Sequence, residues 1–173
     1  MRGILLLLAS AAILALPAAA TARAQSRHHA PGFLVVRNAS TDLGVGGKPV
    51  ATVAVNGFVI GHIKQEGAVK IFRFGTGAAA QVSGVDVLRQ PVKYGPQQGT
   101  KFSGSDFRFR AVGGTWRVVV YGAGVSLYAG GVGRRVSVHG SVYNPHTDGR
   151  YSFDGEPFAS MPSGVVTRNL GTK

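Results

Sequence analysis

The chain has 173 residues, and 19 Lys and Arg against 7 Asp and Glu give it a formal net charge of +12. This length is typical of one ordinary domain, and a hydrophobic content of 45% is enough to form a core that is stable without disulfide bonds. The absence of cysteine excludes disulfide frameworks, thiolate nucleophiles, iron–sulfur clusters and thiolate zinc sites.

The first 24 residues have the pattern of an export signal. Arg2 supplies a positive start, the run 4–16 supplies about 13 largely apolar residues, and Ala-Arg-Ala at 22–24 offers small side chains to a signal peptidase. An N-terminal membrane anchor is the alternative, but the run falls short of the roughly 20 apolar residues that span a bilayer. We therefore expect residues 1–24 to be a signal peptide and the product to be secreted, periplasmic or held in the cell envelope, with no transmembrane segment.

Residues 25–32 (QSRHHAPG) are polar and interrupted by proline, which indicates a flexible arm. Beyond residue 32 no segment has the i, i+3, i+4, i+7 spacing of an amphipathic helix. Instead Val, Phe, Tyr and Thr recur in short runs separated by Gly, Asn, Asp and Pro, which is typical of β-strands and turns. The sequence therefore predicts a single all-β domain over residues 33–173.

In the first half of this domain the clearest signal is Asn56-Gly57, which joins two apolar runs. A type I′ turn needs positive φ at both central residues, and Asn-Gly tolerates this best, so we expect a hairpin of 50–55 against 58–63. Further strands are expected at 33–37, 68–74 and 80–88. The segment 89–99 has two prolines and no periodicity, and we interpret it as a long connection between two halves.

The second half opens with the sharpest alternation in the chain, in which Phe107 and Phe109 point to one side and Arg108 and Arg110 to the other. After a glycine turn the alternation resumes, and it changes phase at the glycines of 122–124, which indicates a β-bulge or a corner. Turns are expected at 130–131, 144–149 and 154–157, and a closing strand at 164–170.

About ten short strands at a spacing of 8 to 12 residues predict an antiparallel β-sandwich or β-barrel. A right-handed β-helix is the alternative, because glycine-rich turns alternate loosely with short VSV and SLY segments, although no fixed-length repeat is present. Strand order and oligomeric state do not follow from these patterns.

Four features occur together in the second half: the FRFR strand, a Gly-Gly-x-Trp-Arg turn, a Gly-x-Gly bend and a closing Tyr-Ser-x-Asp-Gly. With these features the segment from Phe102 onward resembles a group of uncharacterised, exported, glycine-rich all-β proteins of bacteria. The shared motifs are structural. The resemblance implies an all-β fold and export, and it brings no known function, so no activity and no site residue follows from it.

No catalytic constellation is recognisable in the sequence. The Gly-x-Ser-x-Gly elbow of hydrolases is missing, and SGSD at 103–106 precedes a strand and is interpreted as a turn. A polysaccharide hydrolase or lyase would have to use His139, His146, Asp148 or Asp154. We predict no catalytic residue, no metal site and no cofactor.

The basic surplus is the main feature left unexplained by the fold. If the phenylalanines of FRFR point inward, its arginines project outward. Three more arginines, on strands expected to be neighbours, occupy alternating positions that would also place them on the outer face. The predicted binding residues are Arg108, Arg110, Arg117, Arg135 and Arg150. Guanidinium groups pair with phosphates and carboxylates. The expected partner is a teichoic-type wall polymer, an acidic polysaccharide or the lipid headgroups of a membrane surface, while export removes the usual nucleic-acid partners.

Three functions therefore remain open. The first is an exported, non-catalytic binding or structural module that contacts anionic envelope polymers through an arginine-bearing sheet face. The second is the polysaccharide hydrolase or lyase, and the third is a sandwich or barrel that encloses a small apolar ligand. An alternative use of the positive charge is solubility alone.

Overall fold

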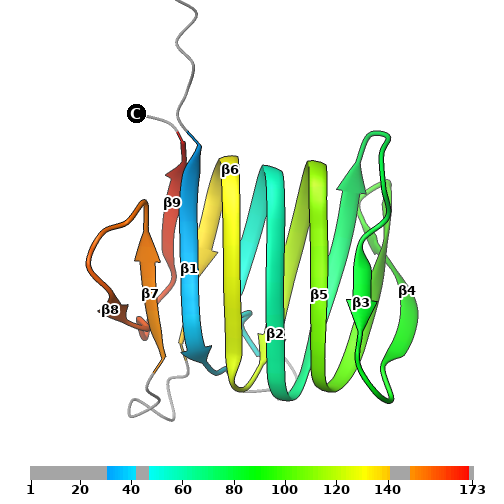
Figure 1. Ribbon diagram of the computed structural model, residues 1–173, viewed down its shortest axis with the longest axis horizontal. Coiled ribbons are helices and arrows are strands. Elements are labelled where there is room, and N and C mark those ends of the chain that lie inside the picture. The colour runs from blue at the N-terminus through cyan, green and yellow to red at the C-terminus, as the bar shows by residue number, and fades with distance from the viewer. Residues whose placement is uncertain (1–30, 42–46, 141–148, 172–173) are drawn as a thin grey trace, which may run out of the picture.

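The computed structural model describes residues 31–41, 47–140 and 149–171, and within these ranges the chain forms nine β-strands and no helix (Figure 1). The strands are β1 (Gly32–Ala39), β2 (Ala51–Phe74), β3 (Gln81–Ser83), β4 (Leu88–Tyr94), β5 (Gln97–Gly122), β6 (Val125–Val138), β7 (Arg150–Phe153), β8 (Ala159–Ser160) and β9 (Val166–Leu170). The predicted signal peptide 1–24, most of the predicted arm 25–32 and most of the expected turn 144–149 lie outside the described residues.

All nine strands belong to one antiparallel sheet, in the order β3-β5-β2-β6-β1-β7-β8, with β4 paired to β5 and β9 paired to β6. The sheet is not closed, and it folds over on itself into two layers because β2, β5 and β6 each run from one layer into the other (Figure 1). The prediction of an antiparallel all-β fold is confirmed. The β-helix alternative does not describe these residues, since every pair of neighbouring strands is antiparallel.

The register shows how the long strands cross between the layers. Val120 of β5 pairs with both Ala51 and Val69, so the two ends of β2 flank β5 in one layer. The middle of β2 (58–63) pairs instead with the middle of β5 (107–112) and with the first half of β6. We call the layer formed by these middle segments with β1, β3 and β7 the front layer. The layer formed by both ends of β2 and β5, the second half of β6, β4 and β9 is the back layer.

The expectation of short strands was wrong for β2, β5 and β6, which extend over 24, 26 and 14 residues. Glycines and polar residues at the corners interrupt the apolar alternation of these strands, while the hydrogen-bonded ladder continues into the other layer. Each long strand therefore has the sequence of several short ones.

The predicted hairpin of 50–55 against 58–63 was wrong. Both runs belong to β2, the first in the back layer and the second in the front layer, and Asn56 does not have the positive φ of a type I′ turn. Gly57 (φ 156°) lies opposite Gly131 (φ 134°) at the corner. A Cβ on either glycine would collide with the backbone of the other strand. Glycine is needed here because two backbones approach closely in a conformation that other residues rarely adopt.

Three further boundaries differ from expectation. The segment 89–99, interpreted as a connection, forms most of β4 and the start of β5, joined by a two-residue turn at 95–96. The expected strand 80–88 is reduced to β3, and the glycine pair 130–131 lies within β6 rather than between strands. The strands expected at 33–37 and 68–74 and the closing strand at 164–170 are confirmed as β1, the end of β2 and β9.

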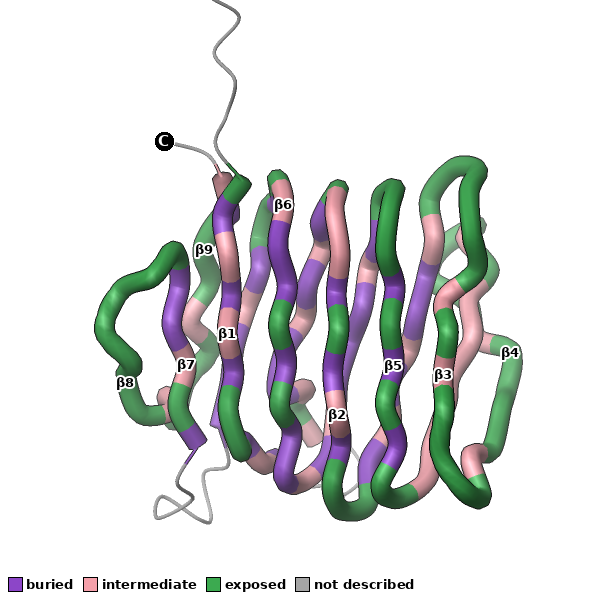
Figure 2. The backbone as a smooth tube through the Cα atoms, viewed as in Figure 1, coloured by how far each residue is buried: buried purple, intermediate pink, exposed green. Residues whose placement is uncertain are grey.

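Side chains that point between the two layers form the hydrophobic core, so buried and exposed residues alternate along the strands (Figure 2). Phe107 and Phe109 are 0% and 1% exposed, and the arginines that alternate with them are exposed, as the pattern predicted. Trp116 and Phe153 are also among the largest fully buried side chains. These rings occupy the interlayer space in which the third hypothesis would place an apolar ligand.

Candidate anion-binding surface

The five predicted arginines do not form one surface. Arg108 and Arg110 project from the front layer on the middle of β5, and Arg150 projects from it on β7. Arg117 lies on the part of β5 that has crossed into the back layer, and Arg135 lies at an irregularity of β6 with a φ of 54°. The structure therefore brings three of the five to one layer and separates the other two from them.

The register places Arg108 and Arg150 in one line of outward side chains across the front layer. Arg150 on β7 lies opposite Arg37 on β1, and Arg108 on β5 lies opposite His62 on β2. Between these pairs Ser126 on β6 lies opposite His62, and its hydroxyl accepts the backbone N–H of Asn38 on β1 at 3.4 Å. The pairing of β1 with β6 is regular as far as Val36 opposite Leu127 and then shifts, so Arg37 lies beside Ser126 at an irregularity of the ladder. We call this line the front row: Arg150, Arg37, Ser126, His62 and Arg108.

Like charges that lie directly opposite one another on neighbouring strands destabilise a sheet. Arg150 and Arg37 are such a pair, both are exposed, and neither has an acidic partner in the described part of the chain. The front row crosses five neighbouring strands, which at about 4.8 Å per strand is roughly 19 Å. An anionic chain laid along the row would replace repulsion between the arginines with attraction to each of them.

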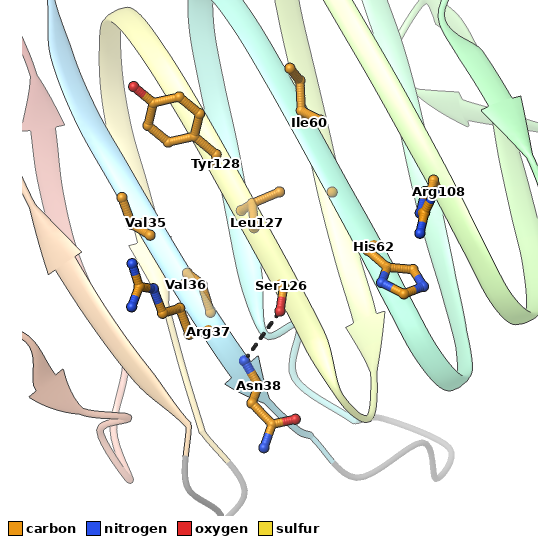
Figure 3. Close-up of a pocket in the computed structure, with 11 residues that line it drawn as sticks. Val35, Val36, Arg37, Asn38, Ile60, His62, Arg108, Ser126, Leu127 and Tyr128 are labelled. Carbon is orange, nitrogen blue, oxygen red and sulfur yellow. Dashed lines mark hydrogen bonds between the residues drawn. The ribbon is translucent and has the colours of Figure 1, made fainter.

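An open groove of about 550 Å³ runs beside the front row, with a polar side and an apolar side (Figure 3). The polar side is lined by the guanidinium groups of Arg37 and Arg108 and the imidazole of His62, and the apolar side by Val35, Ile60 and Tyr128. The apolar residues form the next outward row along the same strands. Ile60 and Tyr128 are 39% and 42% exposed, so a ligand in the groove can contact both charge and apolar surface.

Two phenylalanines fix the ring of Tyr128 beside the groove. It stacks on Phe33 with 5.8 Å between ring centroids and 11° between planes, and it tilts against Phe58 at 5.1 Å. Gly130 leaves room for this cluster, because a Cβ there would lie 2.6 Å from the Phe58 ring and 2.9 Å from the Phe33 ring. Tyr128 is therefore a positioned aromatic surface rather than a freely moving side chain.

Two contacts hold side chains of the front row in place. His62 Nε2 lies 2.7 Å from Asp106 Oδ1, and Asp106 sits at the corner of β5 with a φ of 46°. The Arg37 guanidinium lies 4.5 Å from the ring centroid of Phe158. The Asp106 carboxylate offsets part of the positive charge at the His62 end of the row, so the Arg37 and Arg150 end carries the stronger positive potential.

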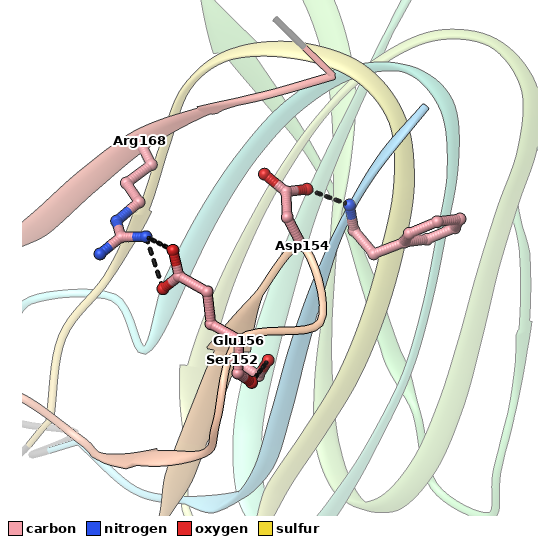
Figure 4. A network of polar contacts seen from close by, with 5 residues as sticks. Ser152, Asp154, Glu156 and Arg168 are labelled. Carbon is pink, nitrogen blue, oxygen red and sulfur yellow. Dashed lines mark hydrogen bonds and ion pairs between the residues drawn. The ribbon is translucent and has the colours of Figure 1, made fainter. Parts of the chain in front are cut away.

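Of the acidic residues in the described part of the chain, only Asp106 contacts the front row. All of them are at corners or turns: Glu66, Asp86, Asp106, Asp154 and Glu156. Asp154 Oδ1 accepts the backbone N–H of Phe33 at 2.8 Å, and Arg168 donates to both carboxylate oxygens of Glu156 at 2.6 Å (Figure 4). Ser152 donates its hydroxyl to the backbone oxygen of Glu156 at 2.6 Å. These contacts attach the turn after β7 to β1 and β9. Both carboxylates of this turn are therefore engaged in contacts that stabilise the fold.

The residues proposed for polysaccharide chemistry do not converge where the structure describes them. Asp154 contacts the start of β1, which pairs with β6 at Gly131, whereas buried His139 follows the far end of β6. Eight residues separate Gly131 from His139 and a strand rises about 3.3 Å per residue, so the two side chains lie more than about 10 Å apart, too far to share one reacting centre. His146 and Asp148 lie outside the described residues.

The sequence analysis did not assign Arg37, His62 or Tyr128 to the predicted binding surface. Alternation with buried neighbours places each of them on the outward side of its strand. Their common line with Arg108 and Arg150 depends on the register between strands far apart in the sequence, and no local pattern reports that register.

A scan against protein-family models found no match to this chain, and searches of curated proteins and of solved structures found none either. Within residues 31–41, 47–140 and 149–171 no group of three or more His, Asp or Glu side chains is placed to hold a metal ion. Over the same residues there is no helix long and apolar enough to cross a membrane.

Proposed function

We propose that this protein is a non-catalytic binding module for anionic polysaccharides of the cell envelope and that it acts outside the cytoplasm. The front row carries this proposal. It sets arginines of three strands and one histidine side by side over five strands, with Asp106 at one end as its only acidic contact among the described residues. Guanidinium groups in such a line match the repeating carboxylates or phosphates of a polyanion.

The apolar side of the groove favours a polysaccharide over a lipid surface. Tyr128 and Ile60 form an apolar surface against which the C–H face of a sugar ring can pack. The acidic group of the same sugar can then reach Arg37 or Arg108. Pockets that combine aromatic surface with a few placed polar groups orient their ligands in this way. Lipid headgroups would satisfy the arginines and leave the apolar side unused.

The export pattern of residues 1–24 supports the location. It would bring the protein to the compartment in which acidic wall polysaccharides occur and away from the nucleic acids that would compete on charge.

Co-sedimentation with isolated bacterial cell walls and, separately, with anionic liposomes tests the proposal. The front variant Arg37→Gln/Arg108→Gln/Arg150→Gln removes three charges from the row. A charge control, Lys48→Gln/Lys64→Gln/Arg134→Gln, removes three from exposed positions outside it. We expect wall binding to weaken with salt and to fall about tenfold or more in the front variant, with the control close to wild type. Equal losses in both variants, or no wall binding at low salt, would refute the proposal.

Tyr128→Ala separates the two anionic surfaces because it leaves the charge unchanged. We expect it to reduce binding to cell walls and to leave binding to liposomes as it was. Wild-type binding that is stronger on liposomes than on walls, and insensitive to Tyr128→Ala, would assign the front row to lipid headgroups instead.

A further inference from the structure

The back layer carries a second group of cations on its outward side. Lys70 on β2 lies directly opposite Lys101 on β5, and Arg117 lies in the next outward row, opposite Phe72. Val69 and Val118, which adjoin Lys70 and Arg117, are buried in the core, so these two cations point to the outer surface. Lys101 is directly opposite Lys70 and therefore shares its face of the sheet. None of the three has an acidic partner in the described ranges. We call Lys70, Lys101 and Arg117 the back cluster.

Aromatic rings hold two members of the back cluster in place. The Arg117 guanidinium lies 4.3 Å from the ring centroid of Tyr94, and Tyr94 in turn tilts against Phe72 at 5.7 Å. Lys70 Nζ lies 5.1 Å from the ring centroid of Tyr121. The Nε of Arg117 is buried without a hydrogen-bond partner, so its binding capacity lies in the terminal nitrogens at the outer end. Side chains ordered in this way lose less freedom when an anion binds.

Three features of the back cluster match those of the front row. Two like charges face each other across neighbouring strands, which destabilises the sheet until an anion lies between them. Exposed aromatic surface lies beside the charges, since Tyr94 is 48% exposed. The acids of the described chain lie at corners and turns rather than in this surface. Charge complementarity therefore points to the same class of ligand, a polymer that bears carboxylate or phosphate groups.

The two surfaces cannot be reached by one straight segment of polymer. The front row and the back cluster point out of opposite layers, and packed sheets lie about 10 Å apart before the outer side chains are added. A second copy of this chain does not suit the back cluster, because it would present cations to cations.

We propose that the back cluster is a second binding site for anionic polysaccharide and that each molecule therefore bridges two polymer segments. The bridging step rests on the proposed function of the front row. The back site itself does not, and the two ideas can be tested apart.

Two polygalacturonate probes distinguish binding from bridging. A short labelled oligomer reports the number of sites per molecule by fluorescence anisotropy at low salt, and the long polymer reports cross-linking by turbidity. The variants are the front variant, the charge control and a matched back variant, Lys70→Gln/Lys101→Gln/Arg117→Gln. All three variants remove three positive charges from the chain.

We expect wild type and the charge control to bind two oligomers per molecule and to cross-link the long polymer. The front and back variants should each bind one oligomer, with an affinity at the altered site reduced about tenfold or more, and neither should cross-link. A back variant that still binds two oligomers or cross-links like wild type would overturn the inference. A charge control that loses cross-linking to the same extent as the back variant would also overturn it.

The failure of the proposed function has a different signature. A front variant that keeps two sites, beside a back variant that loses one, would refute the front row and retain the back site. Circular dichroism and thermal melting check that each variant folds. A second back variant, Lys70→Gln/Lys101→Gln, keeps the contact of Arg117 with Tyr94 and is also expected to lose cross-linking, so a folding defect at Arg117 cannot account for the result.

Discussion

Replacing Arg150 by Glu should stabilise the unliganded protein and weaken its binding to anionic polymers. Arg150 on β7 lies directly opposite Arg37 on β1. Neither arginine forms an ion pair with a carboxylate among the described residues. Opposite Cβ atoms lie about 5 Å apart, and two exposed guanidinium groups at the ends of flexible side chains settle at roughly 8 Å. Repulsion at that separation in water is about 0.5 kcal/mol, of which about 0.4 kcal/mol survives at 10 mM salt.

Charge reversal removes this repulsion and adds an attraction of similar size, so the free energy of unfolding should rise by about 0.8 kcal/mol at 10 mM salt. With a urea dependence of about 2 kcal/mol per molar, the unfolding midpoint should rise by about 0.4 M. In 1 M salt, where the screening length is about 3 Å, the gain should vanish. Urea unfolding at 10 mM and at 1 M salt measures the gain and its loss. Tryptophan fluorescence reports the unfolding because Trp116 is buried in the core and becomes exposed when the protein unfolds.

Arg134→Glu is the matched control, because it makes the same change in net charge at an exposed position outside the front row. An equal gain in this control would show that total charge, rather than the pair, is responsible. A gain for Arg150→Glu that persists in 1 M salt, or in a background that already carries Arg37→Gln, would refute the reasoning from register.

Three further predictions concern the fold, and urea unfolding measures each of them. Gly131→Ala should destabilise by about 2 kcal/mol or more, because φ is 134° and the new Cβ would collide with the backbone at Asn56, whereas Gly164→Ala, in open space without a strained φ, should stay within about 0.5 kcal/mol. Phe109→Ala should cost about 3–5 kcal/mol, a large share of a typical total of 5–15 kcal/mol, because the ring is 1% exposed. Glu156→Gln should cost no more than about 0.5 kcal/mol, since the Arg168 and Glu156 side chains are 47% and 55% exposed and solvent screens the pair.

Local patterns predicted which side of each strand faces the core, and they failed at the corners. The alternation of phenylalanine and arginine in FRFR assigned inside and outside correctly. Asn56-Gly57 has the composition of a hairpin turn, yet the two runs that it joins find their hydrogen bonds with β5 and β6 rather than with each other. The glycine is required by the approach of Gly131, which is far away in the sequence, so no window around residue 57 contains the reason for it.

The same limit applies to the candidate site. Parity predicted that Arg110 and Arg117 both point outward, and both do. They nevertheless face opposite sides of the molecule, because β5 crosses from the front layer to the back layer at the glycine pair between them. The alternation along a strand predicts whether a side chain points into the core or outward. Which of the two outer surfaces it points from depends on where the strand crosses between the layers. Of the five arginines predicted as one surface, Arg108 and Arg150 lie in the front row and Arg117 lies in the back cluster, while Arg110 and Arg135 belong to neither.

The distribution of charge bears on whether the positive surplus serves solubility alone. Solubility requires net charge and is served well by signs that alternate over the surface, since neighbouring opposite charges also relieve repulsion. Here the acids of the described chain lie at corners and turns, while cations face cations across the strands in both layers, at Arg150 and Arg37 and at Lys70 and Lys101. Each such pair lowers the stability of the empty protein and gains from a bound polyanion. Segregation of this kind slightly lowers the stability of the unliganded protein, and it supports the proposal of two anion-binding faces over the use of charge for solubility alone.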